Sequence, residues 1–145
     1  MTRINIIPPA ELCDQHLLAE HRELTRIPNL VAKGKFSLEG QPSDYKLGTG
    51  HVKFLFDKMQ FLFERYNSLH EECLARGFNV KNIWPENLTK DEFFWKNYIP
   101  TESAILENRE RIKIRMPEKP RFTARKNFDF LQKHERNTQR NFTKN

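Results

Sequence analysis

The stretch "AEHRELTR", residues 19–26, places one carboxylate, Glu23, between two arginines, Arg22 and Arg26. On a helix, Arg22 and Arg26 are i,i+4 neighbours, and Glu23 and Arg26 are i,i+3 neighbours, so the three side chains can meet. Two interpretations are open. The residues can form a solvated ion-pair face, or Glu23 can act as a general acid/base between arginines that clamp a row of phosphates.

The second position of the chain holds a small residue, Thr2, which is followed by Arg3. A small second residue predicts that Met1 is removed and that the Thr2 amine is exposed. Such an amine has a pKa of about 7.8, so a far larger share of it is neutral near neutral pH than of a lysine side chain. A neutral amine can attack an electrophilic carbon and form a Schiff base, and Arg3 would lower the amine pKa and attract a phosphate.

A metal site is the weakest interpretation of the polar residues on the first helix. His16, Glu20 and Glu23 follow one another at i, i+4 and i+7, but ligands in a line on one helix rarely converge on one ion. Cys13 and Cys73 lack metal-ligand spacing, and we expect two reduced thiols. The sequence also lacks a Gly-rich phosphate loop, so we expect neither a metal nor another cofactor.

The spacing of apolar residues predicts an all-α protein, with three main helices in one compact domain and a basic C-terminal extension. We expect the first helix to open at the prolines of "IIPPAEL" and to end at Pro28. Residues 29–48 contain three glycines and a proline, and we expect a loop there.

The central helix is expected over residues 49–77, with Thr49 as its N-cap and Gly77 as its left-handed end. "TKDE" at 89–92 has the pattern of a capping box that opens a short helix. A last helix is expected over 98–116, with Thr101 as its N-cap.

Positive charge is concentrated toward the C-terminus. The 145-residue chain has a net charge of +6, and residues 117–145 hold eight Lys or Arg against three Asp or Glu. A concentrated basic segment favours binding to a polyanion, most often nucleic acid, although a tail kept for solubility is the alternative. We expect a domain at 1–125 and a mobile basic tail at 126–145.

The sequence gives no sign of secretion or of a membrane span. No run approaches the roughly 20 apolar residues that a span needs, and the N-terminus lacks a basic-then-apolar signal pattern. We therefore expect an intracellular protein that does not enter a membrane.

Five blocks of the sequence follow one another: "MTRIN" at 1–5, "QHLLAEHREL-R" at 15–26 (with Thr25 at the dash), "LGTGHVKFLFDKMQFL" at 47–62, "ECLARGFN" at 72–79 and "YIPTESAI" at 98–105. In this order they resemble the pyrimidine-dimer DNA glycosylases of T-even phages, the endonuclease V family. The resemblance implies a compact all-α monomer, encoded by a phage, that excises cyclobutane pyrimidine dimers from double-stranded DNA and then nicks the backbone as an apurinic/apyrimidinic (AP) lyase. It also implies that the reaction needs no metal.

The resemblance assigns roles to individual residues. The nucleophile is the α-amine of Thr2, and the essential carboxylate is Glu23. The residues expected to bind DNA are Arg3, Gln15, His16, Arg22, Arg26, Arg111 and Arg115. In the implied reaction the amine displaces the base from C1′ of the sugar, an imine forms, and β-elimination breaks the backbone, while Glu23 stabilises positive charge on the sugar and moves the C2′ proton.

The C-terminal region departs from the family. The family ends in an aromatic run close to Trp-Tyr-Lys-Tyr-Tyr-Gly, where this chain has "RFTARKNFDF" and then a basic extension. Phe122 stands where the family has Trp, and His21 replaces a Tyr beside Arg22. Two alternatives therefore stay open: the same imine chemistry on another damaged or modified pyrimidine, and a non-catalytic damaged-DNA-binding protein of the same fold.

Overall fold

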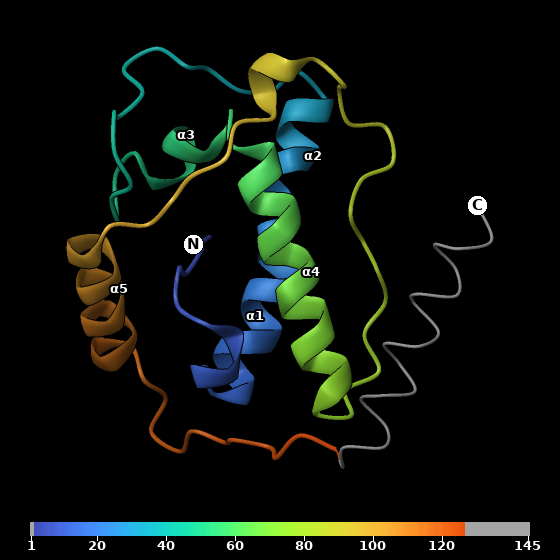
Figure 1. Ribbon diagram of the computed structural model, residues 1–145, viewed down its shortest axis with the longest axis vertical. Helices are drawn as coiled ribbons and strands as arrows, with labels where there is room; N and C mark the ends of the chain where they lie inside the picture. Colours follow the sequence, from blue (N-terminus) through green and yellow to red (C-terminus); the bar gives the residue numbers. More distant parts are fainter. Residues whose placement is uncertain (1, 127–145) are drawn as a thin grey trace.

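A computed structural model describes residues 2–126 of the chain (Figure 1). Within this range every regular element is a helix, which confirms the all-α fold with α1, α4 and α5 as its main helices. The predicted tail at 126–145 lies outside the described residues except for Lys126. The elements are the 3-10 helices Pro9–Glu11 (η1) and Glu92–Phe94 (η2) and the α-helices Asp14–Leu24 (α1), Arg26–Ala32 (α2), His51–Leu55 (α3), Met59–Ala75 (α4) and Glu102–Ile114 (α5).

The centre of the domain is the contact between α1 and α4, which lie side by side in Figure 1. Leu17 and Leu24 of α1 are fully buried, as are Leu62, Tyr66 and Leu69 of α4. Full burial of each such side chain contributes about 1.5–3 kcal/mol to stability. The buried apolar side chains of α4 therefore fix α1 in place.

The prediction that Pro28 ends the first helix is wrong. The chain turns at Thr25, a new helix begins at Arg26, and Pro28 is the third residue of that helix, α2. The first four N–H groups of a helix have no partner within it, so a proline costs nothing there. The loop predicted from residue 29 accordingly begins after Ala32.

The predicted single helix over 49–77 is broken between α3 and α4. At the break, the buried Asp57 carboxylate accepts hydrogen bonds from Gln41 and Lys96, at 2.9 Å each. The backbone N–H of Lys96 also donates to the Asp57 carbonyl at 3.2 Å. The segments that contain Gln41 and Lys96 thus bind the side chain and the backbone carbonyl of Asp57 at the point where a continuous helix would run.

The helix ends follow the sequence in two places and depart from it in two. Thr101 caps α5 by accepting from the Ala104 N–H, and Gly77 after α4 has a φ of +91°, as predicted. Thr49 is not the N-cap of α3, because Gly50 takes that position with a φ of +90°, which disfavours any residue with a Cβ. The predicted capping box at 89–92 is wrong as well, because Asp91 caps the short η2 helix.

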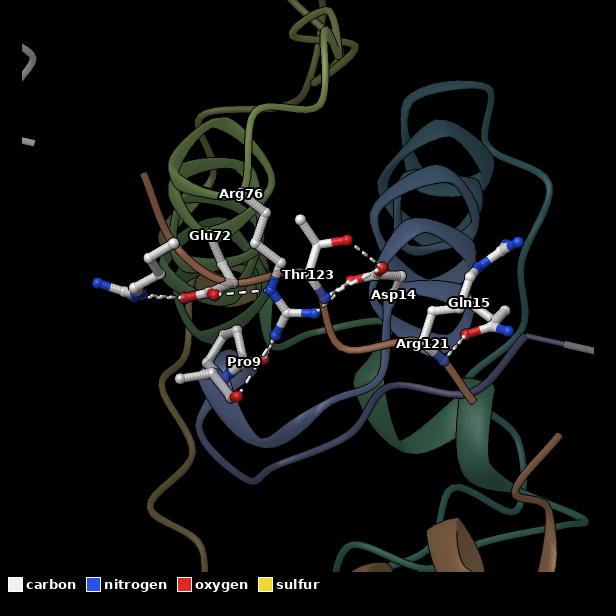
Figure 2. Close-up of polar contacts among 9 residues, drawn as sticks. Pro9, Asp14, Gln15, Glu72, Arg76, Arg121 and Thr123 are labelled. Carbon is white, nitrogen blue, oxygen red and sulfur yellow. Dashed lines mark hydrogen bonds and ion pairs between the residues drawn. The ribbon is translucent and has the colours of Figure 1, made fainter. Parts of the chain in front are cut away.

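The segment after α5 crosses the N-terminal end of α1 and reaches the C-terminal end of α4. Figure 2 shows its attachment: the buried Asp14 carboxylate accepts from the Thr123 N–H at 3.0 Å and from Arg76 at 2.9 Å. Arg76 in turn binds Glu72 at 2.8 Å. Although burial alone would raise the Asp14 pKa, the hydrogen bonds from Thr123 and Arg76 outweigh it and lower that pKa. Residues 117–126 are thus part of the folded domain.

Candidate active site

A pocket of about 380 Å³ lies between the N-terminal segment, α1, the approach to α3, and α5. Six of the nine site residues predicted from sequence line it. They come from chain positions more than 100 residues apart, and their meeting is a property of the fold. The six are Thr2, Arg3, His16, Glu23, Arg111 and Arg115.

The N-terminal segment brings Thr2 and Arg3 to the pocket wall. The Nε atom of Arg3 is buried and has no hydrogen-bond partner in the structure. Burial lowers the Arg3 pKa, and the nearby charges of Arg111 and Arg115 lower it further. Because Arg3 lines the pocket together with other cations, its guanidinium can bind a phosphate or another anion there.

His16 reaches the same pocket from the first turns of α1. Its Nε2 lies 3.2 Å from the carbonyl oxygen of Arg115, which can only accept, so Nε2 carries the proton. The other ring nitrogen, Nδ1, is buried without a partner and therefore has a free lone pair. Burial lowers the His16 pKa, the bond to Arg115 opposes this shift, and Arg3 adds to it. The lowered pKa favours the neutral imidazole.

The two glutamates of α1 that line the pocket differ in their partners. Glu20 is 2% exposed, and its carboxylate binds Arg65 at 2.8 Å and Asn5 at 2.7 Å. Glu23 is 21% exposed at its side chain, and its ion pair with Arg22 spans 4.0 Å. The charge of Glu20 is therefore balanced by Arg65 within the core. The Glu23 carboxylate has only a long ion pair with Arg22 and is available to a substrate.

The charge of the pocket wall is positive overall. Arg111 of α5 and Arg115, which directly follows this helix, face it together with Arg3. The Glu20 charge is offset by Arg65. These three arginines can attract a polyanion and keep it near the carboxylate of Glu23. Arg111 and Arg115, both expected from the sequence to bind DNA, thus line the pocket.

Three of the predicted DNA-binding residues lie outside the pocket lining. Arg22 and Arg26 are exposed on α1 and α2, with the Arg22 side chain 69% accessible. Gln15 instead attaches the C-terminal segment, because it donates to the Lys119 carbonyl at 2.9 Å and accepts from the Arg121 N–H at 3.0 Å. A DNA contact by these residues would be made on the surface around the pocket.

The remaining six residues of the pocket wall were not among the predicted site residues: Asn5, Ala19, Glu20, Leu47, Gly48 and His51. "LGTGH" at 47–51 was one of the blocks that carry the resemblance, yet its glycines suggested only the start of a helix. Gly48 has a φ of +78° and turns the chain toward the pocket. A signal was therefore present at 47–51, but nothing local connects it to the N-terminus.

Two general features of the described residues bear on the site. Within residues 2–126, no three His, Cys, Asp or Glu side chains are grouped so that they could hold a metal ion. No helix in the same range has the length and the apolar character that a membrane span requires.

Comparison with known families gives one match that covers more than half of the chain. The family model described as pyrimidine dimer DNA glycosylase matches residues 1–86. The chain belongs to this family. It is therefore a DNA repair enzyme of the glycosylase class that acts on damaged DNA, and the resemblance inferred from the five sequence blocks is confirmed.

The family match covers only part of the residues that line the glycosylase's pocket. Thr2, Arg3, His16 and Glu23 lie within residues 1–86, whereas Arg111 and Arg115 lie beyond this range, in α5 and at its C-terminal end. The positions expected to carry the chemistry thus fall in the matched part. Arg111 and Arg115, which add positive charge to the pocket, lie outside the matched range.

Proposed function

We propose that the chain is a bifunctional enzyme that excises cyclobutane pyrimidine dimers from double-stranded DNA and then cleaves the abasic strand as an AP lyase. The single observation that carries the proposal is the shared pocket of Thr2, Glu23 and the arginines Arg3, Arg111 and Arg115. This pocket combines a candidate amine, a carboxylate and cations, which is the set that imine chemistry on a sugar–phosphate backbone needs.

The reaction starts with removal of Met1, which leaves Thr2 with a free α-amine. The neutral amine forms a bond to C1′ of the 5′ sugar of the dimer, and the C1′–N bond to the base breaks with its electron pair on the base. The amine proton goes to the departing base. The bond from C1′ to the ring oxygen O4′ then breaks, O4′ takes a proton from water, and the protonated imine between Thr2 and C1′ remains.

The lyase step uses the acidity that the imine gives to C2′. Glu23 takes a C2′ proton, the electrons form the C2′–C3′ double bond, and the C3′–O bond breaks with its electrons on the 3′ phosphate. Water then hydrolyses the imine and frees the Thr2 amine. Glu23 also stabilises the positive charge on the sugar during base loss, while the arginines bind the flanking phosphates.

We further expect the enzyme to work as a phage-encoded monomer inside the cell, as the resemblance implies. Its affinity for DNA should have a large, salt-sensitive part that does not depend on sequence, since the site and its surroundings are basic. Gel filtration at low micromolar concentration tests the monomer, and a salt titration of DNA binding tests the electrostatic contribution.

The deciding experiment is borohydride trapping on three duplex oligonucleotides: one with a single cyclobutane dimer, one with an abasic site, and one undamaged. A covalent adduct on the dimer, mapped to Thr2 by mass spectrometry, is the expected result. An adduct on the abasic duplex alone would keep the imine chemistry and replace the dimer by another damaged pyrimidine. If no duplex gives an adduct while Met1 is absent by mass, the chain only binds damaged DNA.

A further inference from the structure

The N-terminal segment is held along four consecutive residues by side chains from different parts of the chain. The Ile6 N–H donates to the Asn108 side chain of α5 at 2.7 Å, and the Ile7 carbonyl accepts from Arg65 of α4. The side chain of Asn5 donates to Glu20 of α1 at 2.7 Å. These contacts place the segment between α5 and the α1–α4 pair.

Of these four residues, Ile4 is the nearest in sequence to the candidate nucleophile, Thr2. Both of its backbone groups are bound by buried side chains. Its N–H donates to Nε2 of His51 at 2.8 Å, and its carbonyl accepts from the Tyr45 hydroxyl at 2.7 Å. Ile4, Tyr45 and His51 are 0%, 6% and 3% exposed. The peptide groups on either side of the Ile4 Cα are therefore held in one orientation.

The two side chains that bind Ile4 are themselves fixed. The Nδ1 of His51 lies 2.8 Å from the carbonyl oxygen of Lys46, so Nδ1 carries the proton and Nε2 is left as the acceptor that the Ile4 N–H requires. Burial lowers the His51 pKa, which favours this neutral form. The ring of Tyr45 packs edge-on against the His51 ring, with centroids 5.3 Å apart. The His51 tautomer and the Tyr45 ring position are thus set by their surroundings.

This geometry limits where the Thr2 amine can lie. Two residues of extended chain span at most about 7 Å, so the amine must remain within that distance of the Ile4 nitrogen. Glu20, which binds Asn5, lies one turn before Glu23 on α1. The same helix therefore positions the N-terminal segment and carries the candidate catalytic carboxylate.

From these contacts we infer that Tyr45 and His51 are positioning residues for the imine reaction: they hold Ile4 so that the Thr2 amine meets C1′ of the sugar. This inference rests on the proposed function of the Thr2 amine. Neither side chain needs to contact the reacting atoms, because each acts through the Ile4 backbone. Orientation of a nucleophile can be worth several orders of magnitude in rate, and a misplacement of about 1 Å can cost about 100-fold.

The test is the rate of borohydride trapping on an abasic duplex, measured with enzyme in excess and as a function of enzyme concentration. Tyr45→Phe removes only the hydroxyl that binds the Ile4 carbonyl, and His51→Phe keeps a ring but removes the acceptor. We expect each to lower the maximal trapping rate about 10-fold or more, while the enzyme concentration at half-maximal rate stays within about twofold. His51→Gln restores an acceptor near the Nε2 position and should recover most of the rate.

Tyr98→Phe is the matched control, because Tyr98 stacks on Tyr45 with ring centroids 5.9 Å apart, but its hydroxyl bonds to the Thr101 backbone whereas that of Tyr45 bonds to Ile4. It should trap at the wild-type rate. Equal losses in Tyr98→Phe and Tyr45→Phe would mean that a loosened aromatic cluster is responsible, and would overturn the inference. Wild-type rates in both Tyr45→Phe and His51→Phe would also overturn it while leaving the imine proposal intact, whereas absence of trapping by the wild type would refute the imine proposal itself.

Discussion

Glu20 and Glu23 lie one turn apart on α1 and line the same pocket, but Glu20 binds the buried Arg65 at 2.8 Å whereas Glu23 pairs with the exposed Arg22 at 4.0 Å. Two carboxylates of the same helix face are thus used differently. The first belongs to the packing of the core. The second is open to a substrate.

The contrast predicts opposite results for two conservative substitutions. Glu23→Gln should lower the rates of base excision and strand cleavage about 10²–10⁴-fold, because a general acid/base contributes that much, and should leave binding to damaged DNA and the melting temperature nearly unchanged. Glu20→Gln should instead destabilise the fold by about 3–5 kcal/mol, because it leaves Arg65 buried without its charge partner. Single-turnover kinetics and thermal unfolding of both variants check this, and normal turnover by Glu23→Gln would remove Glu23 from the mechanism.

Blocking the N-terminal amine should abolish imine trapping while the fold stays intact. Acetylation of Thr2, or a variant in which Met1 is retained, removes or displaces the neutral amine without touching the residues that hold Ile4. The readout is borohydride trapping on an abasic duplex, with the state of the N-terminus established by intact mass. Trapping at the wild-type level by the blocked protein would point to a lysine nucleophile.

Acid should destabilise the protein partly through His21. Its Nε2 lies 3.0 Å from Nδ1 of His70 and its ring stacks on Tyr66, and burial together with His70 lowers its pKa from 6.5 to about 4. Between these two values the unfolded chain binds more protons than the folded one, so stability should fall as the pH decreases from about 6.5 to about 4.

The variant His21→Phe tests this, because it keeps an aromatic ring against Tyr66 and removes the titrating group. As the pH is lowered from roughly 7.5 to roughly 4.5, which spans the titration range of histidine, the melting temperature should fall less in the variant than in the wild type. The lowered pKa values of His16 and His51 are common to both proteins and do not affect the difference. Parallel curves would show that His21 does not contribute.

Removal of residues 127–145 should make binding to undamaged DNA less sensitive to salt. The deleted part carries four Lys or Arg, and each phosphate that these side chains no longer neutralise should reduce the slope of log affinity against log salt by about 0.9. The truncation keeps Lys126, whose N–H donates to the Ala75 carbonyl, so the end of the described domain stays attached. A full-length protein with the same four residues changed to Gln is the matched control, and an unaltered slope would mean that the tail does not contact DNA.

The sequence predicted those parts of the fold that depend on local signals. Thr101 and Gly77 mark helix ends through side-chain capping and a positive φ, and both features are visible in a few neighbouring residues. The break between α3 and α4 was not predictable in this way, because it depends on contacts of Asp57 with Gln41 and Lys96, which no helical periodicity reveals. Pro28 misled for a related reason: its position is acceptable only because a new helix begins two residues earlier.

The candidate site was predictable where the resemblance supplied its members and unpredictable where packing did. Thr2, Glu23 and Arg111 were expected at one site and do line one pocket. The burial of Glu20 was not foreseen, because its partner Arg65 is 45 positions away and no local sequence pattern connects the two residues. The boundary between the domain and its tail at residue 126 stays a prediction, since the described residues end there.

The attachment of the N-terminal segment has a consequence for the order of events during synthesis. Residues 2–7 leave the ribosome first, but Asn108, which binds Ile6, is made 102 residues later. At about 5–20 residues per second, this segment remains unanchored by α5 for about 5–20 s. We therefore expect the aminopeptidase that removes Met1 to act during translation, before the end of the chain that it must reach is enclosed by α5.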